Sequence, residues 1–230
     1  MACYSCSQKI TIENDELQGA ISQIWLDANA AQEMLGGIDT NDLSEYEMQR
    51  YRLAEAHLML KRELRLPAGS DIEALASYFG NYGDVASASE AYYIQGAYLN
   101  WLGKNTEAMQ YLKKAENNPA PSIIQGMTYY KMGRISESEQ LYDIALENYQ
   151  KALPYLEKAG LPLYLASVYR ELGRNSNSEG RDMYFDKALN AARFMKDSIL
   201  YMDIRYAQLS ISQPNSPEIA NICQHMCHEV

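Results

Sequence analysis

Two related stretches decide how this chain folds. The first is IQGAYLNWLGKNTEAMQYLKKA, Ile94 to Ala115, and the second is IQGMTYYKMGR, Ile124 to Arg134. Each has Ile-Gln-Gly, then an aromatic run, then a second glycine, and the second stretch begins 30 residues after the first. A repeated catalytic loop and a repeated structural unit are two explanations of this pattern. Alanines downstream favour the structural unit, because a catalytic loop does not need small residues at helical spacing.

Composition places the chain among globular proteins with an acidic surface. It has 230 residues, of which 47% are hydrophobic, and 30 acidic against 20 basic side chains give a net charge of −10. That charge opposes the counterion release by which basic proteins bind nucleic acid, so we expect no nucleic-acid partner. No window approaches the ~18 consecutive apolar residues of a membrane helix.

The N-terminus, MACYSCSQKI, is short and polar and lacks the basic region and apolar core of a signal peptide. Ser5-Cys6-Ser7, followed by a polar tether, resembles the cleavage region of a bacterial lipoprotein, where a cysteine thiol takes the lipid. Cys6 is therefore a candidate lipidation site, and that lipid would be the only membrane contact of the chain. The other interpretation is an ordinary disordered tether over residues 1–14.

Metal and cofactor sites are not expected. Cys223, His225, Cys227 and His228 carry the thiol and imidazole groups that zinc binds. However, the two cysteines lie four residues apart on an expected terminal helix, and no second distant pair completes a zinc knuckle. The chain also lacks the G-x-x-x-x-G-K-[ST] loop that holds nucleotide phosphates.

Helix signals run through the chain, and strand alternation is nearly missing. Serine followed three residues later by glutamate has the form of a capping box and predicts helix starts at Ser44, Ser70, Ser136 and Ser176. Pro162 suits a first helical turn, as does Pro217. Glycines that follow apolar periodic runs are expected to close helices in the left-handed conformation: Gly37, Gly83, Gly103, Gly133, Gly160 and Gly173.

These starts and stops predict about twelve helices in six antiparallel pairs, because short connections force consecutive helices side by side. The expected pairs are 15–27 with 30–36, 44–63 with 70–82, 85–102 with 105–116, 121–132 with 136–159, 162–172 with 179–195, and 197–211 with 216–227.

The small and large residues of these pairs resemble the tetratricopeptide repeat (TPR), in which Gly or Ala lets a neighbouring helix approach and a large residue fills the adjacent hole. The first copy has Gly96, Leu99, Gly103, Ala108, Leu112 and Ala115, with Tyr92 and Gln95 where the motif has Trp and Leu. The second has Gly126, Tyr129, Gly133, Ala145, Tyr149 and Ala152, and the third has Leu165, Ala166, Tyr169, Gly173, Phe185 and Ala188.

In this frame Gly103, Gly133 and Gly173 end the first helices of three repeats, at intervals of 30 and 40 residues. The second interval then contains about seven extra residues before Ala145, close to two turns at ~3.6 residues per turn. The frame therefore predicts one long helix over 136–159.

The resemblance implies an all-α fold, a right-handed superhelical α-solenoid of about six antiparallel helix pairs. We expect a single domain over 15–230, with a cap at 15–43 and repeats near 44–84, 85–118, 119–160, 161–196 and 197–230. Such arrays need atypical ends, because a terminal repeat has no neighbour to cover it.

No nucleophile, base and acid can be assembled with confidence, and His57 in the middle of an expected helix is better explained as a structural residue. We therefore predict a non-enzymatic scaffold that binds a protein or peptide. The TPR resemblance implies a concave groove lined by first helices: Tyr93, Ala97, Asn100 and Trp101, then Ile124, Met127, Tyr130 and Lys131, then Leu163, Tyr164, Ser167 and Arg170. Some family members clamp a terminal carboxylate with Lys, Asn and Arg here, but this chain has mostly aromatic and apolar residues. Burial of several of these rings between repeats is the competing interpretation.

Two further hypotheses concern context. The chain also resembles lipid-anchored TPR proteins of Gram-negative bacteria, which implies an extracytoplasmic sensing part of a signalling protein and slightly favours the cell envelope over the cytoplasm. A homo-oligomer is the other hypothesis, because an uncovered terminal helix pair could pair with its copy through Ile204, Tyr206, Leu209 and Ile211.

Overall fold

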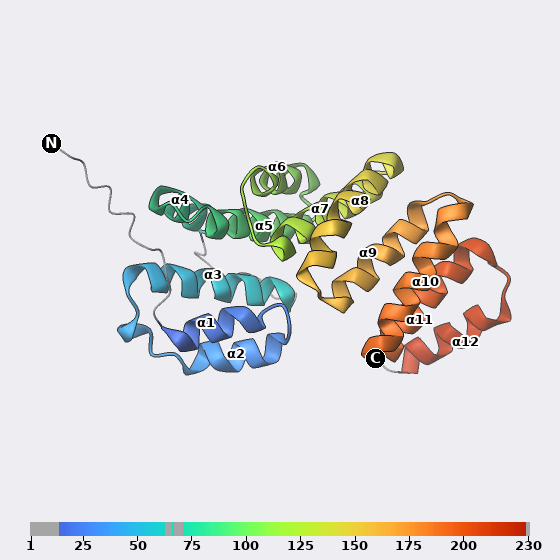
Figure 1. Ribbon diagram of the computed structural model, residues 1–230, viewed down its shortest axis with the longest axis horizontal. Coiled ribbons are helices and arrows are strands. Elements are labelled where there is room, and N and C mark those ends of the chain that lie inside the picture. The colour runs from blue at the N-terminus through green and yellow to red at the C-terminus, as the bar shows by residue number, and fades with distance from the viewer. Residues whose placement is uncertain (1–13, 63–65, 67–70, 229–230) are drawn as a thin grey trace. The chain divides into compact units, whose positions relative to one another are not determined.

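The computed structural model describes residues 14–62, 66 and 71–228. Regular structure in this part of the chain is helical throughout, with twelve α-helices, a short 3-10 helix at Thr40–Asp42 and no strand, so the predicted all-α, TPR-like fold class is confirmed (Figure 1). The α-helices are α1 (Asp15–Gln23), α2 (Ala28–Gly37), α3 (Glu45–Lys61), α4 (Ile72–Tyr82), α5 (Val85–Trp101), α6 (Asn105–Glu116), α7 (Ser122–Ser138), α8 (Tyr142–Ala159), α9 (Pro162–Asn175), α10 (Ser178–Met195), α11 (Ser198–Ser212) and α12 (Pro217–His228).

The chain divides into two compact units, Met1–Ala120 and Pro121–Val230, which we call the first and second units. Within each unit, helices pack mainly against their neighbours in sequence, as the short connections predict. The single domain expected over 15–230 stays a prediction.

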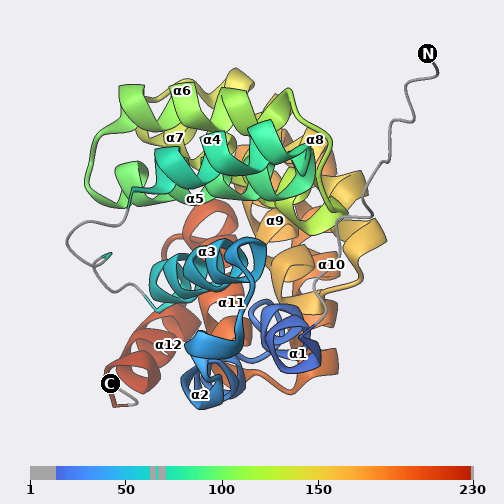
Figure 2. The same ribbon diagram turned by 90° about the vertical axis from the view of Figure 1, so that its left-hand side faces the viewer.

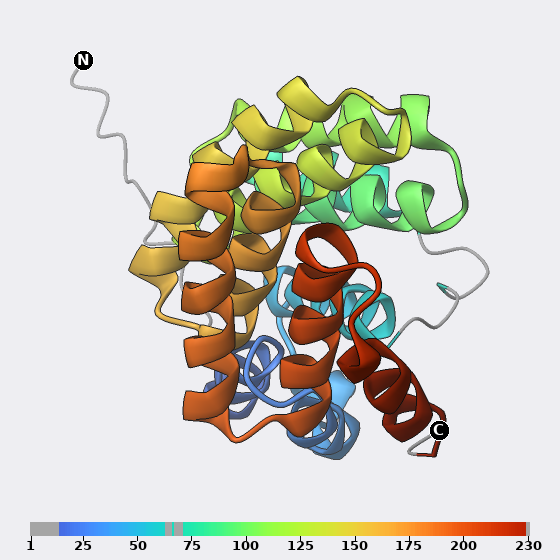
Figure 3. The same ribbon diagram turned by 90° about the vertical axis from the view of Figure 1, so that its right-hand side faces the viewer.

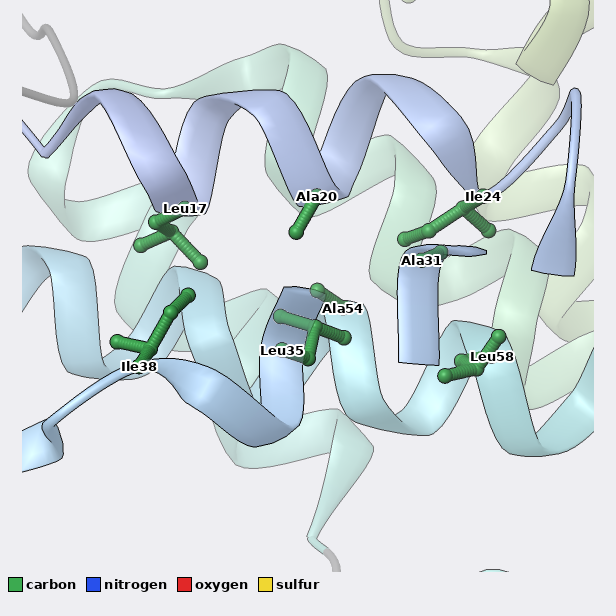
Figure 4. Packing of buried hydrophobic residues seen from close by; sticks show 8 residues of the cluster. All are labelled: Leu17, Ala20, Ile24, Ala31, Leu35, Ile38, Ala54 and Leu58. Atoms are coloured by element: carbon green, nitrogen blue, oxygen red, sulfur yellow. The ribbon is translucent and has the colours of Figure 1, made fainter. Parts of the chain in front are cut away.

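The first unit begins with an apolar core shared by α1, α2 and α3 (Figure 4). Leu17 on α1 and Ile24 directly after this helix point toward the other two helices, and Leu35 on α2 and Leu58 on α3 meet them. Burying each such side chain stabilises the fold by about 1.5–3 kcal/mol. This burial holds together a cap whose first two helices are short. After α3 come α4, α5 and α6, which lie alongside one another (Figure 2).

The second unit contains three helix pairs, α7 with α8, α9 with α10, and α11 with α12. Figure 3 shows α9, α10 and α11 side by side, and α11 contacts both of the others. Phe185 and Leu189 of α10 pack here with Ala166 of α9 and Ile204 of α11. The first helices of the last two pairs, α9 and α11, are therefore brought together.

Helix starts agree with the sequence in some places and not in others. Ser44 makes the predicted capping box with Glu47, and Pro162 and Pro217 occupy first turns. Ser136 is wrong as a helix start: it is buried within α7 and its hydroxyl donates to the Met132 carbonyl.

The other two predicted boxes are replaced by neighbouring caps. Asn177, not Ser176, caps α10 by accepting from the Gly180 amide. Asp71 caps α4, and Ser70 lies outside the described residues. In both cases an adjacent Asn or Asp side chain is at least as good an acceptor as serine.

Three of the six predicted glycine stops are confirmed. Gly83, Gly103 and Gly160 have positive φ angles of 88°, 76° and 68° directly after helices, a conformation that glycine adopts without strain. Gly37 is the last residue of α2, and its φ is not positive. Gly133 lies inside α7, so the prediction that it ends a helix is wrong.

Gly173 is likewise inside α9. The predicted long helix over 136–159 is also wrong. Instead α7 continues to Ser138, the chain turns through Gln140 at φ 61°, and α8 begins at Tyr142.

The wrong helix end at Gly133 and the wrong long helix have one cause, which is the residue chosen as the first glycine of the second repeat. A Cβ atom at Gly96 would lie 2.7 Å from Cγ of Leu112, and one at Gly133 would lie 2.5 Å from Cε1 of Tyr149. In both pairs the large residue follows 16 positions later, so Gly133 is the counterpart of Gly96. Gly126 also approaches a second helix, with Leu156 Cγ at 2.7 Å, and it stands two helical turns before the true counterpart.

This frame extends to the third repeat at Gly173, where a Cβ would lie 3.0 Å from Cδ2 of Phe185. The intervals become 37 and 40 residues, so no long insertion is required. Counted from Gly96, Gly133 and Gly173, the side chains at 12, 16 and 19 positions further on are all buried. They are Ala108, Leu112 and Ala115 in the first repeat, Ala145, Tyr149 and Ala152 in the second, and Phe185, Leu189 and Ala192 in the third.

Tyrosine stands four residues before each of these glycines and packs against a tyrosine of the following helix, tilted in the first repeat and stacked in the other two. Ring centroids are 6.5 Å apart for Tyr92 and Tyr111 and 5.8 Å for Tyr129 and Tyr155. The pair of Tyr169 with Tyr184 lies at 6.3 Å. Aromatic pairs at such distances stabilise by about 0.5–1.5 kcal/mol beyond their burial, so tyrosine here replaces the tryptophan of the motif.

Candidate functional site

A polar groove of about 370 Å³ lies within the second unit. We call it the arginine groove. Its walls come from α7, α9 and α11, the first helices of three consecutive pairs. The lining residues are Arg134, Glu137, Ser138, Arg170, Glu171, Arg174, Asp203, Tyr206 and Ala207.

Helical spacing explains why these side chains converge. Arg134 and Ser138 are four residues apart on α7, and Arg170 and Arg174 are four apart on α9, so each pair shares one face of its helix. On α11, Asp203 opposes Arg170 and forms an ion pair with it. Because the Gly133 and Gly173 contacts set the rotation of α7 and α9, the repeat frame aims these faces at one groove.

Glu171 is the buried centre of the charged cluster, with 3% of its side chain exposed. Its Oε1 accepts from Nη2 of Arg170 at 2.6 Å and lies 3.9 Å from Nη1 of Arg134. Its Oε2 lies 3.4 Å from Nε of Arg174. One carboxylate thus neutralises guanidinium groups from two helices, as a buried charge requires.

The three arginines differ in how fully they are bonded. Arg170 donates twice to Glu171 and once to Asp203, so its fork is occupied. Arg174 has ion pairs only at 3.4 Å, to Glu137 and Glu171. Arg134 has a 3.5 Å hydrogen bond to the Tyr130 hydroxyl besides its 3.9 Å pair with Glu171.

Arg134 and Arg174 also reach solvent, with 49% and 46% of their side chains exposed. An arginine carries five N–H donors in a planar fork that suits carboxylate or phosphate. These two side chains are therefore the groups of the groove that are best placed to bind a partner.

Two tyrosines that are hydrogen-bonded to groove residues stay neutral hydroxyls. Burial, with the nearby charge of Glu171, raises the pKa of Tyr130 above its ordinary value. Burial also raises the pKa of Tyr149, as do the charges of Glu171 and Glu137, and its hydroxyl donates to Glu137 at 2.8 Å. These two hydroxyls therefore do not titrate near neutral pH.

The twelve residues of the sequence-predicted groove belong to both units, four to the first and eight to the second, and their joining into one binding site stays a prediction. Five are buried, in line with the competing interpretation, and those are Tyr93, Ala97, Ile124, Met127 and Tyr130. Of the rest, Asn100 bonds Asn105, Ser167 bonds the Leu163 carbonyl on its own helix, Lys131 and Tyr164 are partly buried, and Trp101 and Leu163 are exposed.

Only Arg170 of this set lines the arginine groove, and Tyr130 reaches it through Arg134. Sequence reasoning missed Arg134, Glu137, Glu171, Arg174 and Asp203. The signal was present in the constant spacing of 12 residues from Gly96 to Ala108 and from Gly133 to Ala145. With that spacing, the second repeat begins two helical turns later in the sequence than was predicted. Arg134 and Glu137 then take the groove positions that the prediction had given to Met127 and Tyr130.

A second charged cluster lies within the first unit. His57 is fully buried, and its Nδ1 is 2.8 Å from Oε1 of Glu90, whose Oε2 lies 3.2 Å from Nη1 of Arg50. The ring of Trp25 meets the His57 ring edge-on at 4.5 Å. The expectation that His57 is structural agrees with this closed setting, in which Arg50 also donates to Ser87.

Burial alone would raise the pKa of Glu90, but the charge of Arg50 and the bond from His57 lower it to about 2. Glu90 is therefore ionised at all ordinary pH values, and its neighbours have an anion to pair with.

Several candidate sites from the sequence can be placed only in part. Cys6 lies outside the described residues, so lipidation, the sensing hypothesis and the envelope location stay predictions. Cys223 is exposed and not in a disulfide. Among the side chains that are described, no group of three or more His, Cys, Asp or Glu could hold a metal ion. Helices long and apolar enough to cross a membrane are likewise not found there.

The face proposed for self-association is only partly available. Ile204 and Leu209 are buried within the second unit, which corrects the expectation that they are exposed. Tyr206 and Ile211 do reach the surface.

Comparisons with known proteins give a limited likeness. The chain is 33% identical over 104 residues to photosystem I assembly protein Ycf3 of Prochlorococcus marinus strain MIT 9301, and equally to the protein of strain MIT 9312. The match covers 42% of this chain and spans 59% of the length of each relative. No protein-family model and no solved structure matches the chain.

Proposed function

We propose that this chain is a non-enzymatic helical-repeat scaffold that binds a segment of a protein partner in the arginine groove and assists assembly of a multiprotein complex. The observation that carries the proposal is the groove itself. Three successive first helices line it, and two of its arginines are half exposed and loosely bonded. Stacked helix pairs present such first helices as a continuous binding face.

The comparison adds the assembly role. Ycf3 is named for photosystem I assembly, and partial identity with it supports a protein as the partner and binding as the activity. A pocket with donors on rigid helices suits an extended segment, because preformed polar groups fix its direction. From the sequence-predicted groove, Leu163 is an exposed side chain in the same unit as the arginine groove, and Trp101 is an exposed side chain of the first unit.

Photo-crosslinking tests the proposal. A benzoylphenylalanine at Tyr206, in the groove and 40% exposed, is expected to form an adduct with a partner in an extract of the source organism. The same group at Tyr155 on α8, 38% exposed and outside the groove, is the matched control. Adducts at neither position, or equally at both, would contradict the proposal.

A further inference from the structure

We propose that the arginine groove recognises an internal segment of its partner through one acidic side chain, whose carboxylate bridges Arg134 and Arg174. This inference rests on the proposed function, because it names the chemistry of the segment that the groove binds. It differs from capture of a chain terminus, since a side-chain carboxylate requires no free end.

The first argument is the balance of donors and acceptors. Formal charge in the groove is even, with three arginines and three carboxylates. Each arginine nevertheless presents about five donors and each carboxylate two oxygens. Both oxygens of Glu171 already face arginines, and Glu137 accepts from Tyr149 besides lying near Arg174. The surplus is in N–H donors, so the complementary ligand supplies acceptors.

The second argument is the contrast among the arginines. Arg170 is held by Glu171 and Asp203 and has only 18% of its side chain exposed, so it has little to offer a ligand. Arg134 and Arg174 come from adjacent first helices and both lie within 4 Å of the same buried Glu171. That shared neighbour holds the two forks near each other while the exposed N–H groups remain free to meet an oxyanion.

The third argument concerns the size of the ligand charge. The whole chain carries a net charge of −10, which repels polyanions such as nucleic acid over long range. A single carboxylate that reaches two guanidinium groups gains short, charge-assisted hydrogen bonds. An acidic side chain in an otherwise neutral segment therefore suits this groove better than a phosphate polymer.

Binding of labelled peptides to the full chain, followed by fluorescence anisotropy, tests the inference. The main probe is an amidated glycine peptide with one central glutamate, and the matched probe replaces that glutamate with glutamine. A third probe is the glutamine peptide with a free terminal carboxylate, and inorganic phosphate serves as a competitor. We expect only the glutamate peptide to bind well, and phosphate to compete weakly.

Variants assign the effect to the two forks. Arg134→Gln and Arg174→Gln are each expected to weaken binding of the glutamate peptide about tenfold, because each removes a hydrogen-bonded charge partner. Lys151→Gln on α8 is the control, since it removes one positive charge from the same unit at a similar side-chain exposure of 47%. Helical circular dichroism should be unchanged in all three.

Three results would overturn the inference: glutamine peptides that bind as well as glutamate ones, free-terminus peptides that bind best, or equal losses in Lys151→Gln. If Tyr206 crosslinks a partner while the glutamate peptide does not bind, the acidic ligand is wrong and the scaffold function stands. If neither occurs, both fail.

Discussion

Each unit of the molecule holds a carboxylate among positive side chains, and the two clusters are built in opposite ways. In the first unit, Glu90 meets Arg50 and His57, and the side chains of all three are at least 87% shielded from solvent. In the second unit, Glu171 is buried more deeply still, but Arg134 and Arg174 beside it are about half exposed. The same chemistry is closed in one case and open in the other.

The difference separates a stabilising role from a binding role. A closed cluster cannot lose a member without leaving a buried charge or donor unpaired, which is costly. An open cluster tolerates the loss of one exposed arginine, because Arg170 still pairs with the buried Glu171 and water reaches the other exposed arginine. The closed cluster therefore belongs to the fold, and the open cluster is the one that we propose binds a partner.

The largest expected effect is from Glu90→Ala. It leaves Arg50 and His57 buried without their acid and should lower the free energy of unfolding by about 3–5 kcal/mol, as measured by urea denaturation. Glu147→Ala, at an exposed ion pair with Lys151, is the control and should cost less than about 1 kcal/mol. A similar small cost at Glu90 would remove the distinction between closed and open clusters.

The pH dependence of stability sharpens the same point. Folding lowers the pKa of Glu90 from 4.5 to about 2. Its contribution to the free energy of unfolding is therefore complete above the pKa of the unfolded chain, and it is lost as pH falls toward the pKa of the folded protein. Urea midpoints of the wild type should fall across this window more steeply than those of Glu90→Gln. Parallel curves for the two proteins would show that Glu90 is not the group responsible.

Close helix contacts should be similar in the two units, whatever their charges. Gly133→Ala forces a methyl against the fully buried ring of Tyr149 and should destabilise by about 1–3 kcal/mol, and Gly96→Ala against Leu112 should act alike. Gly180→Ala, whose new methyl would meet nothing nearer than 3.5 Å, should be neutral or stabilising. Thermal melts measure all three, and a tolerated Gly133→Ala would contradict the revised repeat frame.

The smallest expected effect is from Arg174→Gln. Its ion pairs are long and half exposed, so the free energy of unfolding should change by less than about 1 kcal/mol even though binding is impaired. A loss as large as that of Glu90→Ala, again by urea denaturation, would mean that the groove cluster is structural after all.

Much of the fold could be predicted from local signals. Ser44 with Glu47, Pro162 and the left-handed Gly83, Gly103 and Gly160 act within a turn or two, so the sequence alone identifies the helix ends that they make. The fold class followed from the same signals and from the repeat.

The frame of the second repeat could not be found locally. Gly126 and Gly133 are seven residues apart on one face of α7, and both approach α8, so either fits the glycine position of the motif. Ser136 has the form of a cap but bonds the preceding turn instead. Groove residues of the second repeat are assigned by counting from its first glycine. Because Gly126 was used in place of Gly133, the count began two turns too early and selected apolar neighbours instead of Arg134.

The placement of tryptophan gives the chain a built-in optical label. Its two tryptophans, Trp25 and Trp101, both belong to the first unit, whereas tyrosines occur in both units. Selective excitation of indole therefore reports on the first unit alone, and Trp25 sits against the buried His57 whose environment changes when that unit opens. Indole emission and total helical signal, recorded on one sample, would reveal whether the two units unfold together or in succession.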